Sequence, residues 1–473
     1  MSDLSLRSTA NALVGRQPEI KALGARLDES LSGHGGVSLL AGEPGIGKTR
    51  LLEEMTAVAE ARGACVLWGR CYEGEGAPAF WPWIQILRAA VRDSPAAFVE
   101  PLGPGASDLA QLIPEIQAQR AAEPHAAPPP AADPVQARFR LFDAVTAVVG
   151  RRAATRPQVL ILDDLHWADA SSLLLLQFIA RSVQAMPLLV LGAYRDAEID
   201  PEHPLTATLA ALSRERGYER RVLHGVPPDA VAALLADACG TDRVALSIIQ
   251  ELHELTAGNP LFIRETLRHL IETGRLTTQD GAESEEAPAL TAIEAPEGVR
   301  WVLRQRLARL PENAAQVLSI AAVIGHEFDI ATLASALESD GLPVMETLDA
   351  AEAARLVTTV PDGGAGAVLR YRFEHDLIRA TLQGDLSRAT RVRLHHRVGE
   401  ALEDRWRIDP DAHLSELAYH FVQAAPSGDV AKAITYARRA GDHAARQFAY
   451  DEAARWYATA LDVMGFMTPA DNT

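Results

Sequence analysis

Short apolar runs and helical patterns alternate along the first half of the chain. Each run has the length of a strand that is buried on both faces, and the segments between the runs place apolar residues three or four positions apart, as on one face of a helix. The runs lie at residues 37–41, 64–68, 158–163, 187–194 and, more weakly, 221–224. This alternation over residues 10–225 predicts an α/β domain built on a five-stranded parallel sheet.

The pattern changes after residue 226, where the strand-like runs stop and helical patterns dominate. Helices are predicted at residues 229–239 and 243–256. The tripeptide Gly-Asn-Pro at residues 258–260 then ends one helix and begins the next. We interpret it as punctuation, because glycine favours helix C-termini and proline favours the first helical turn. Residues 276–297 are acidic and contain proline, as linkers do.

The segment of residues 298–385 combines short helices with a predicted hairpin. Its helical patterns lie at residues 299–310, 314–324, 330–337 and 344–356, and its two apolar runs at residues 356–360 and 368–373. A glycine-rich turn separates the two runs, so the segment predicts a winged helix. The recognition helix of this unit would carry Arg355 against Glu346, Asp349 and Glu352. Because phosphate neutralisation supplies much of the affinity for DNA, we expect no DNA contact by this helix.

The remainder of the chain is helical and begins a repeat. Small and bulky residues between residues 437 and 460 fall at the spacing of one tetratricopeptide repeat. One repeat cannot bury its own apolar face, so we expect either a longer protein or a stacking partner elsewhere. The proline-rich residues 121–134 predict a flexible surface insertion in the first domain. The expected domains are the α/β domain, a helical lid with its linker, a winged helix and a helical repeat region, at residues 1–225, 226–297, 298–385 and 386–473.

Composition and charge narrow the classes of partner. The 473 residues include 45 Lys and Arg against 63 Asp and Glu, a formal net charge of −18. This excess of negative charge disfavours sequence-independent binding of nucleic acids. Cys65, Cys71 and Cys239 form no CxxC pair, which favours a reducing compartment. No apolar run reaches membrane-spanning length and the N-terminus lacks the apolar core of a signal peptide, so we expect a cytoplasmic protein without membrane contact.

The strongest chemical motif comes directly after the first strand. Gly42 is followed, after four residues, by Gly47, Lys48 and Thr49. This is the spacing of a phosphate-binding loop, in which glycines let backbone amides face anionic oxygens. Lys48 would reach the β- and γ-phosphates, and Thr49 would offer a hydroxyl to Mg²⁺. The α/β domain at residues 1–225 is therefore expected to have the fold of P-loop NTPases and to be an ATPase domain. The residues expected to surround the phosphates are Gly42, Pro44, Gly45, Ile46, Gly47, Lys48, Thr49 and Arg50.

A second motif ends the strand at residues 158–163. Asp163 would lie at the carboxyl edge of the sheet, where it can bind Mg²⁺ beside Thr49, and Asp164 would polarise an attacking water. Arg195 comes after the strand at residues 187–194 and can contact the γ-phosphate. The aromatics Phe80, Trp81 and Trp83 are interpreted as packing residues.

In order along the chain, these motifs resemble those of the STAND class of AAA-related signal-transduction ATPases, in particular the large bacterial LuxR-type regulators and cyclase-associated ATPases. The segments that carry the resemblance are LVGRQPEI, GEPGIGKTRLLEEM, VLILDDLHWAD, LLVLGAYRD, LTAGNPLFIRETL and RYRFEHDLIRATL. The resemblance covers nearly the whole chain.

The resemblance implies further roles at the nucleotide site. Val14, Gly15, Arg16 and Pro260 would contact the adenine region, and Arg195 would be the γ-phosphate sensor. His375 would correspond to the histidine that touches the β-phosphate of ADP in immune-receptor relatives. The segment around it reads Phe-Glu-His-Asp and lacks the methionine that precedes the histidine in those relatives.

Taken together, these features predict an ATPase that acts as a slow, regulatory switch with ATP/ADP and Mg²⁺ as ligands. Lys48, Asp164 and Arg195 are the expected catalytic residues. In the ATP state the protein would self-associate, an inducer or protein partner would bind the helical repeats, and DNA would be bound only by a domain outside this chain. The alternatives are an origin-recognition-type AAA ATPase that binds DNA through its winged helix, the ATPase module of an adenylate cyclase, and a scaffold with a degenerate nucleotide site.

Overall fold

A computed structural model describes the chain from residue 13 to residue 465. The description leaves out residues 73–75, 94–105, 120–132, 240–245, 273–306, 308–309, 312, 361–368 and 408–410. Most of the predicted insertion at residues 121–134, the linker at 276–297 and nearly all of the helix at 299–310 therefore lie outside the described residues.

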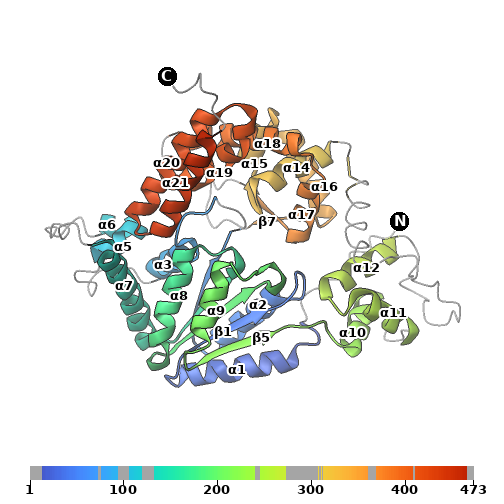
Figure 1. Ribbon diagram of the computed structural model, residues 1–473. Helices are drawn as coiled ribbons and strands as arrows, with labels where there is room; N and C mark the ends of the chain where they lie inside the picture. The colour runs from blue at the N-terminus through green and yellow to red at the C-terminus, as the bar shows by residue number, and fades with distance from the viewer. Residues whose placement is uncertain are drawn as a thin grey trace.

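A parallel five-stranded sheet forms the core of the first domain, as predicted. Its order is β2-β3-β4-β1-β5 (Figure 1). The strands are β1 (Gly36–Ala41), β2 (Cys65–Arg70), β3 (Gln158–Asp163), β4 (Leu188–Tyr194) and β5 (Tyr218–Val222). The last strand begins three residues before the predicted run, because the polar residues at its start pair with β1 without forming an apolar pattern.

Helices cover both faces of this sheet, and alternate strand residues supply the two cores. Leu160 and Leu162 of β3 belong to one core, while Val159 and Ile161 belong to the other. The first core lies under α3 (Trp81–Asp93), α5 (Ala106–Leu112), α6 (Pro114–Gln119), α7 (Pro134–Thr155), α8 (Ala170–Ser182) and α9 (Pro204–Leu212). The second lies under α1 (Gln17–Leu31) and α2 (Lys48–Ala61). Successive residues of a strand point to opposite faces of the sheet, and here both sets are apolar, so the sheet is buried on both faces.

Three helices beyond the sheet form a lid with a core of its own. They are α10 (Pro228–Cys239), α11 (Leu246–Thr256) and α12 (Pro260–Glu272). Their apolar faces enclose residues such as Val231, Leu252 and Ile263, and Val14 from the start of the chain packs against this core. The lid lies beside the sheet in Figure 1.

The next segment pairs helices with a small antiparallel sheet. Its elements are α14 (Ala314–Ile324), β6 (Glu327–Asp329), α15 (Ile330–Leu337), α16 (Gly341–Ala353), β7 (Val357–Val360), β8 (Arg370–Phe373) and α17 (Asp376–Gly384). The predicted hairpin is present, since β7 and β8 pair antiparallel. The third strand, β6, pairs with β8 and has no signature in the sequence, because three residues between two helices show no alternation.

The C-terminal helices continue the core of this segment and return to the first domain. They are α18 (Arg388–Arg405), α19 (Leu414–Ala424), α20 (Val430–Arg446) and α21 (Tyr450–Met464). One apolar cluster runs from Val317 to Val463 without a break at residue 385. Helix α21 also packs against α8. The pair α20–α21, expected to need a stacking partner, therefore has partners in both α19 and α8.

Two further expectations concern burial and membranes. Cys65 and Cys71 are buried free thiols. Phe80 and Trp83 are fully buried, and the indole of Trp83 donates to the carbonyl of Ser172 at 3.0 Å, so both pack as predicted. Within the described part of the chain, no helix has the length and apolar character needed to cross a bilayer.

Candidate nucleotide site

The glycine-rich loop joins the buried strand β1 to helix α2. Gly42, Gly45 and Gly47 all have positive φ angles, of 154°, 78° and 99°. A side chain at Gly45 would also collide with Leu261 of the lid, since a Cβ atom there would lie 2.6 Å from the Cβ of Leu261. Glycine is required here both for the turn and for the close approach of the lid. The loop delivers its amides and the N-terminus of α2 to one point, which suits an anion.

Lys48 lies buried at the start of α2 and turns back over the loop. Its Nζ atom donates to the carbonyls of Gly42 at 2.7 Å and Glu43 at 2.9 Å. Burial, together with the nearby cation of Arg195, lowers the pKa of Lys48 to about 8. A bound phosphate group would raise the pKa of Lys48 again, because its negative charge favours the protonated amine and offsets the charge of Arg195.

Thr49 and Asp163 bring two oxygen ligands together. The hydroxyl of Thr49 donates to Oδ2 of Asp163 at 3.0 Å, and the backbone amide of Asp164 donates to Oδ1 at 3.1 Å. Asp163 is almost fully buried, and this burial raises its pKa. A hydroxyl beside a carboxylate fits Mg²⁺, which takes few protein ligands and completes its shell with waters and phosphate oxygens.

Asp164 adopts a conformation that is rare for residues other than glycine. Its φ is 57°, in the left-handed region, where the chain leaves β3 and enters the 3₁₀ turn Leu165–Trp167. Burial and the neighbouring carboxylate of Asp163 raise its pKa well above the usual range. Left-handed aspartates at cavity walls are strained, and such strain is often found at functional sites.

Arg195 comes after β4, the neighbour of β3, so it stands beside the two aspartates as predicted. Its guanidinium donates to Glu198 at 2.7 Å and lies 4.7 Å above the ring centroid of Trp167. It also forms an ion pair with Asp376, at the start of α17. The residue expected to sense the γ-phosphate thus holds a carboxylate from a different part of the molecule.

The start of α17 carries a network of charged groups. His326 faces Asp376 at 2.8 Å, and although burial raises the pKa of Asp376, His326 and Arg195 together hold it well below its usual range. The neighbouring His375 lines the same cavity as the phosphate loop. Burial lowers the pKa of His375 to about 4, so its imidazole is neutral at pH 7.

The lid is fastened to the phosphate loop by Asn259. Its side-chain amide donates to the carbonyl of Pro44 at 3.0 Å, and its side-chain oxygen accepts from the amide of Leu261 at 3.1 Å. Asn259 is 1% exposed. The interpretation of residues 258–260 as only a helix end and a helix start was therefore incomplete, because Asn259 links the lid to the loop.

The N-terminal turn contacts both the phosphate loop and the lid. The guanidinium of Arg16 is buried and donates to the carbonyls of Ile46 at 2.9 Å and His224 at 2.7 Å. Gly15 has a φ of 72° and packs against Ala230 of α10. Arg16 therefore ties the phosphate loop to the segment after β5, a contact that the sequence did not suggest.

One cavity of about 600 Å³ joins these groups. The predicted site residues on its wall are Val14, Arg16, Pro44, Gly45, Ile46, Gly47, Lys48, Thr49, Arg50, Asp163, Asp164, Arg195, Pro260 and His375. Gly42 packs against Leu223, next to this wall. The cavity is also lined by residues to which the sequence gave no role, namely Arg70, Tyr72, Trp167, Arg264, His326, Arg372 and Asp376. Of these, Trp167, Arg264, Arg372 and Asp376 lie inside the segments that carry the resemblance, whereas Arg70, Tyr72 and His326 do not.

Comparisons with known proteins agree with the geometry of the first domain. Residues 12–191 match the family described as AAA ATPase domain. This part of the chain contains the phosphate loop, Asp163 and Asp164.

A relative from Rhizobium meliloti, itself described as an uncharacterised protein, is 26% identical over 478 residues. The alignment covers 97% of this chain and 43% of the relative, so the chain spans less than half of that protein's length.

Similar solved structures include a signal transduction ATPase with numerous domains (STAND) and a tetratricopeptide repeat sensor, from Pyrococcus horikoshii. It is 14% identical with a TM-score of 0.46, over 96% of this chain and 65% of that one. The ORC1 protein of Aeropyrum pernix, solved in complex with DNA, is 16% identical with a TM-score of 0.33, over 80% of this chain and 95% of that one.

Proposed function

We propose that the chain binds ATP and hydrolyses it slowly, as a signal-transduction switch of the STAND class. The proposal starts from the match of residues 12–191 to an AAA ATPase domain. In this proposal it is the regulatory ATPase portion of a longer, LuxR-type transcriptional regulator. Residues 298–385 act as a winged helix that closes over the nucleotide, and α20–α21 act as the first tetratricopeptide repeat.

The observation that carries the proposal is the ion pair between Arg195 and Asp376. Arg195 stands at the tip of β4 beside Asp163 and Asp164, where the γ-phosphate of a nucleotide on the loop would lie. A guanidinium held by Asp376 is not fully available to a γ-phosphate. Only ATP carries a γ-phosphate that would compete with Asp376 for Arg195. ATP would therefore weaken the ion pair that holds α17 against the sheet, whereas ADP would leave it intact. Such a differential contact is what a ligand needs in order to shift a conformational equilibrium.

Hydrolysis is assigned to residues on the wall of the cavity. Thr49 and Asp163 would hold Mg²⁺, which when bound neutralises charge on the phosphates. Lys48 stabilises the charge that develops on the transferred phosphoryl group, and Asp164 orients the attacking water. Arg195 adds a second cation once Asp376 releases it. Turnover is slow because the closed arrangement engages Arg195 elsewhere.

The surface of the proposed winged helix favours a switch over a DNA-loading ATPase. The helix before the hairpin, α16, carries Glu346, Asp349 and Glu352 and no basic residue. DNA binding by the complete protein is assigned to a domain outside this chain. The helices α18 to α21 would receive an inducer or protein partner, and opening would expose surfaces for self-association.

Nucleotide binding is tested by titrating the purified chain with a fluorescent ATP analogue in the presence of Mg²⁺. We expect saturable binding that ADP displaces, and a loss of at least about a hundredfold in Lys48→Ala, because the charged contacts to two phosphates are lost. Lys21→Ala is the matched control, since Lys21 is exposed on α1. The proposal fails if no adenine nucleotide binds or if Lys48→Ala binds as the unmodified chain does.

Hydrolysis is tested with Asp164→Asn, which keeps the size of the side chain and removes its charge. We expect nucleotide affinity within about threefold of the unmodified chain and a loss of turnover of about a hundredfold or more, because only the positioning of water is affected. Release of phosphate from single-turnover reactions measures this. Unchanged turnover would remove Asp164 from the mechanism, and the absence of turnover in the unmodified chain would favour the scaffold.

A further inference from the structure

We propose that the cavity contains a second anion-binding subsite, distinct from the phosphate loop, in which Arg70 and Arg372 bind a phosphate group. The proposal does not require hydrolysis. It concerns the part of the cavity that lies beyond Asp163 as seen from the loop, to which neither the motifs nor the family match assigns a ligand.

The order of the strands separates the two places. The loop comes after β1, and β2 is three strands away in the order β2-β3-β4-β1. Three strand spacings amount to about 14 Å. Arg70, the last residue of β2, is the register partner of Asp163. A nucleotide seated on the loop would reach Asp163 with its terminal phosphate, whereas Arg70 lies one strand further out.

Arg70, Arg372 and Trp81 line the same cavity and carry side-chain donors that have no acceptor among the described residues. Among the described residues, neither the guanidinium of Arg70 nor that of Arg372 has an ion pair or a hydrogen bond. The indole N–H of Trp81 is buried, and no described residue accepts from it. Tyr72 packs edge-on against Trp81, with ring centroids 6.2 Å apart. An unpaired buried donor such as the Trp81 indole is costly, and one bound oxyanion would accept from it and from both partly exposed guanidiniums.

Arg70 is held in a fixed place by its backbone. The side chain of Gln85 on α3 accepts from the amide of Arg70 at 3.1 Å and donates to its carbonyl at 3.0 Å. The guanidinium also lies 5.3 Å from the ring centroid of Trp68. Because these contacts fix the main chain of Arg70, no backbone freedom is lost when its side chain binds a ligand.

The acidic groups of this region do not cancel its positive charge. Glu327 is paired with Arg370 at 3.4 Å, so these two neutralise each other. Glu416 lies within electrostatic range of Tyr72, and Asp163 within range of Arg70. Asp163 is the residue assigned to Mg²⁺, and a cation bound there would offset its charge. Two further acidic residues line the cavity, and both have cationic neighbours: Glu53 pairs with Arg50 at 3.7 Å, and Glu374 lies within electrostatic range of Arg264. Arg70 and Arg372 are therefore the guanidiniums of this region that have no ion pair among the described residues.

The geometry favours a phosphate group as the ligand. Two guanidiniums from different elements can each offer a planar pair of N–H donors to a group with several oxygens, and phosphate presents more oxygens than a carboxylate. The group could be orthophosphate, including the product of hydrolysis, or the phosphate of an organic molecule whose remainder lies against Tyr72 and Trp81. Because Arg70 belongs to β2 and Arg372 to β8, the bound phosphate would join the first domain to the small sheet and hold the cavity closed.

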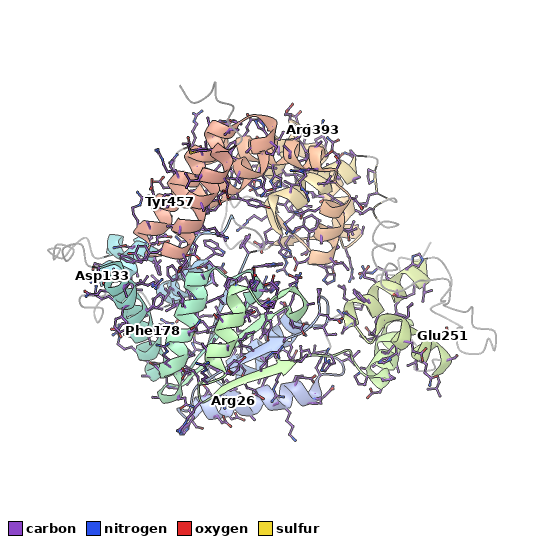
Figure 2. The ribbon with its side chains drawn as sticks, viewed as in Figure 1. Arg26, Asp133, Phe178, Glu251, Arg393 and Tyr457 are labelled. Carbon is purple, nitrogen blue, oxygen red and sulfur yellow. The ribbon has the colours of Figure 1, made fainter. Side chains whose placement is uncertain are left out.

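The test is a calorimetric titration of the full chain with inorganic phosphate after saturation with Mg²⁺ and a non-hydrolysable ATP analogue, which fills the phosphate loop. We expect one phosphate per chain. Arg70→Gln and Arg372→Gln should each weaken binding by about tenfold or more, because each removes a charged pair of donors. Arg393→Gln is the control, since Arg393 is an exposed arginine on α18, remote from the cavity (Figure 2). The two variants lie in different parts of the molecule, so a folding defect in one leaves the other informative.

The outcomes separate this inference from the proposed function. If the unmodified chain binds the analogue and no phosphate, or if both variants bind phosphate as the unmodified chain does, the second subsite does not exist. If the analogue does not bind, the proposed function fails, and the same titration on the Lys48→Ala chain still tests the subsite. Repeating it with glycerol 3-phosphate distinguishes the sources: tighter binding than orthophosphate indicates an organic phosphate, and weaker binding indicates orthophosphate.

Discussion

At the scale of the residue, Lys48 shows how a motif depends on its surroundings. The loop sequence places an amine at the phosphates, but burial and the cation of Arg195 determine how much of that amine is charged. With a pKa of about 8, most of the Lys48 side chains are protonated at pH 7 and few are protonated at pH 9. Phosphates bind the protonated form, so the affinity of the free protein is linked to pH.

We therefore expect nucleotide affinity to be nearly constant from pH 6.5 to 7.5 and to fall by up to about tenfold per pH unit above pH 8. Measuring the dissociation constant of ADP from pH 6.5 to 9.5 checks this. Lys48→Arg is the control, because arginine stays charged throughout this range and should flatten the decline. The same decline in Lys48→Arg would assign the titration to another group.

At the scale of the element, the contact between α21 and α8 rests on a buried carboxyl group. Ser171 donates to Oε2 of Glu452 at 2.7 Å, and Glu452 is 6% exposed. Burial and the neighbouring carboxylate of Asp169 raise the pKa of Glu452 to about 7. Asp169 accepts from the amide and hydroxyl of Ser172, one residue further along, so the N-terminus of α8 is where the two carboxyl groups meet.

The raised pKa makes the neutral form of Glu452 the favoured one in the folded protein. Its contribution is fully present below the ordinary glutamate pKa of about 4.5 and is lost as the pH rises through about 7, at a cost of up to about 3 kcal/mol. We expect the melting temperature to fall between pH 6 and pH 8 in the unmodified chain and to fall less in Glu452→Gln. Thermal unfolding followed by circular dichroism measures this.

The adjacent Asp451 provides the control for Glu452. Its side chain is 53% exposed and pairs with Arg138 at 3.3 Å. Asp451→Asn should keep the pH dependence of the unmodified chain, because an exposed ion pair contributes little. If Glu452→Gln and Asp451→Asn showed the same pH dependence, the buried carboxyl would not be its source.

At the scale of the whole molecule, three parts of the chain supply residues to the cavity and its surroundings. The first domain supplies the loop and the aspartates, the lid supplies Asn259 and Pro260, and the small sheet with α17 supplies His375 and Asp376. Figure 1 shows the C-terminal helices running back from the small sheet towards α8, against which α21 packs. In the proposed switch, a change at the nucleotide would reach the C-terminal helices through Asp376.

Asp376→Asn tests this connection. The substitution removes the charge that holds Arg195 and should raise the affinity for ATP relative to ADP by about tenfold, because Arg195 becomes free for the γ-phosphate. The ratio of the two dissociation constants in competition experiments measures the effect. Asp404→Asn, at an exposed position of α18, should leave the ratio unchanged. A ratio that stays constant in Asp376→Asn would show that Arg195 does not distinguish the nucleotides.

Much of the first domain could be predicted from the sequence because its signals are local. The apolar runs gave the five strands to within three residues, and they also located the loop around Lys48 and the carboxylates after β3. Other features lack a local signal. Strand β6 has three residues and no alternation, and Arg70 ends a strand in a segment without a motif. Asn259 appeared as part of a helix boundary, although its amide fastens the lid to the loop.

The sequence by itself determined the chemistry of the loop, the α/β character of the first domain and the helical character of the rest of the chain, because periodicity and short motifs depend on neighbouring residues. Only the tertiary structure decided which distant groups meet. Arg195 and Asp376 are 181 positions apart, and Ser171 and Glu452 are 281 apart. No periodic pattern relates such pairs, since their approach depends on the packing of whole elements. The loop can therefore be identified from the sequence, whereas the contacts that would make it part of a switch can be identified only from the fold.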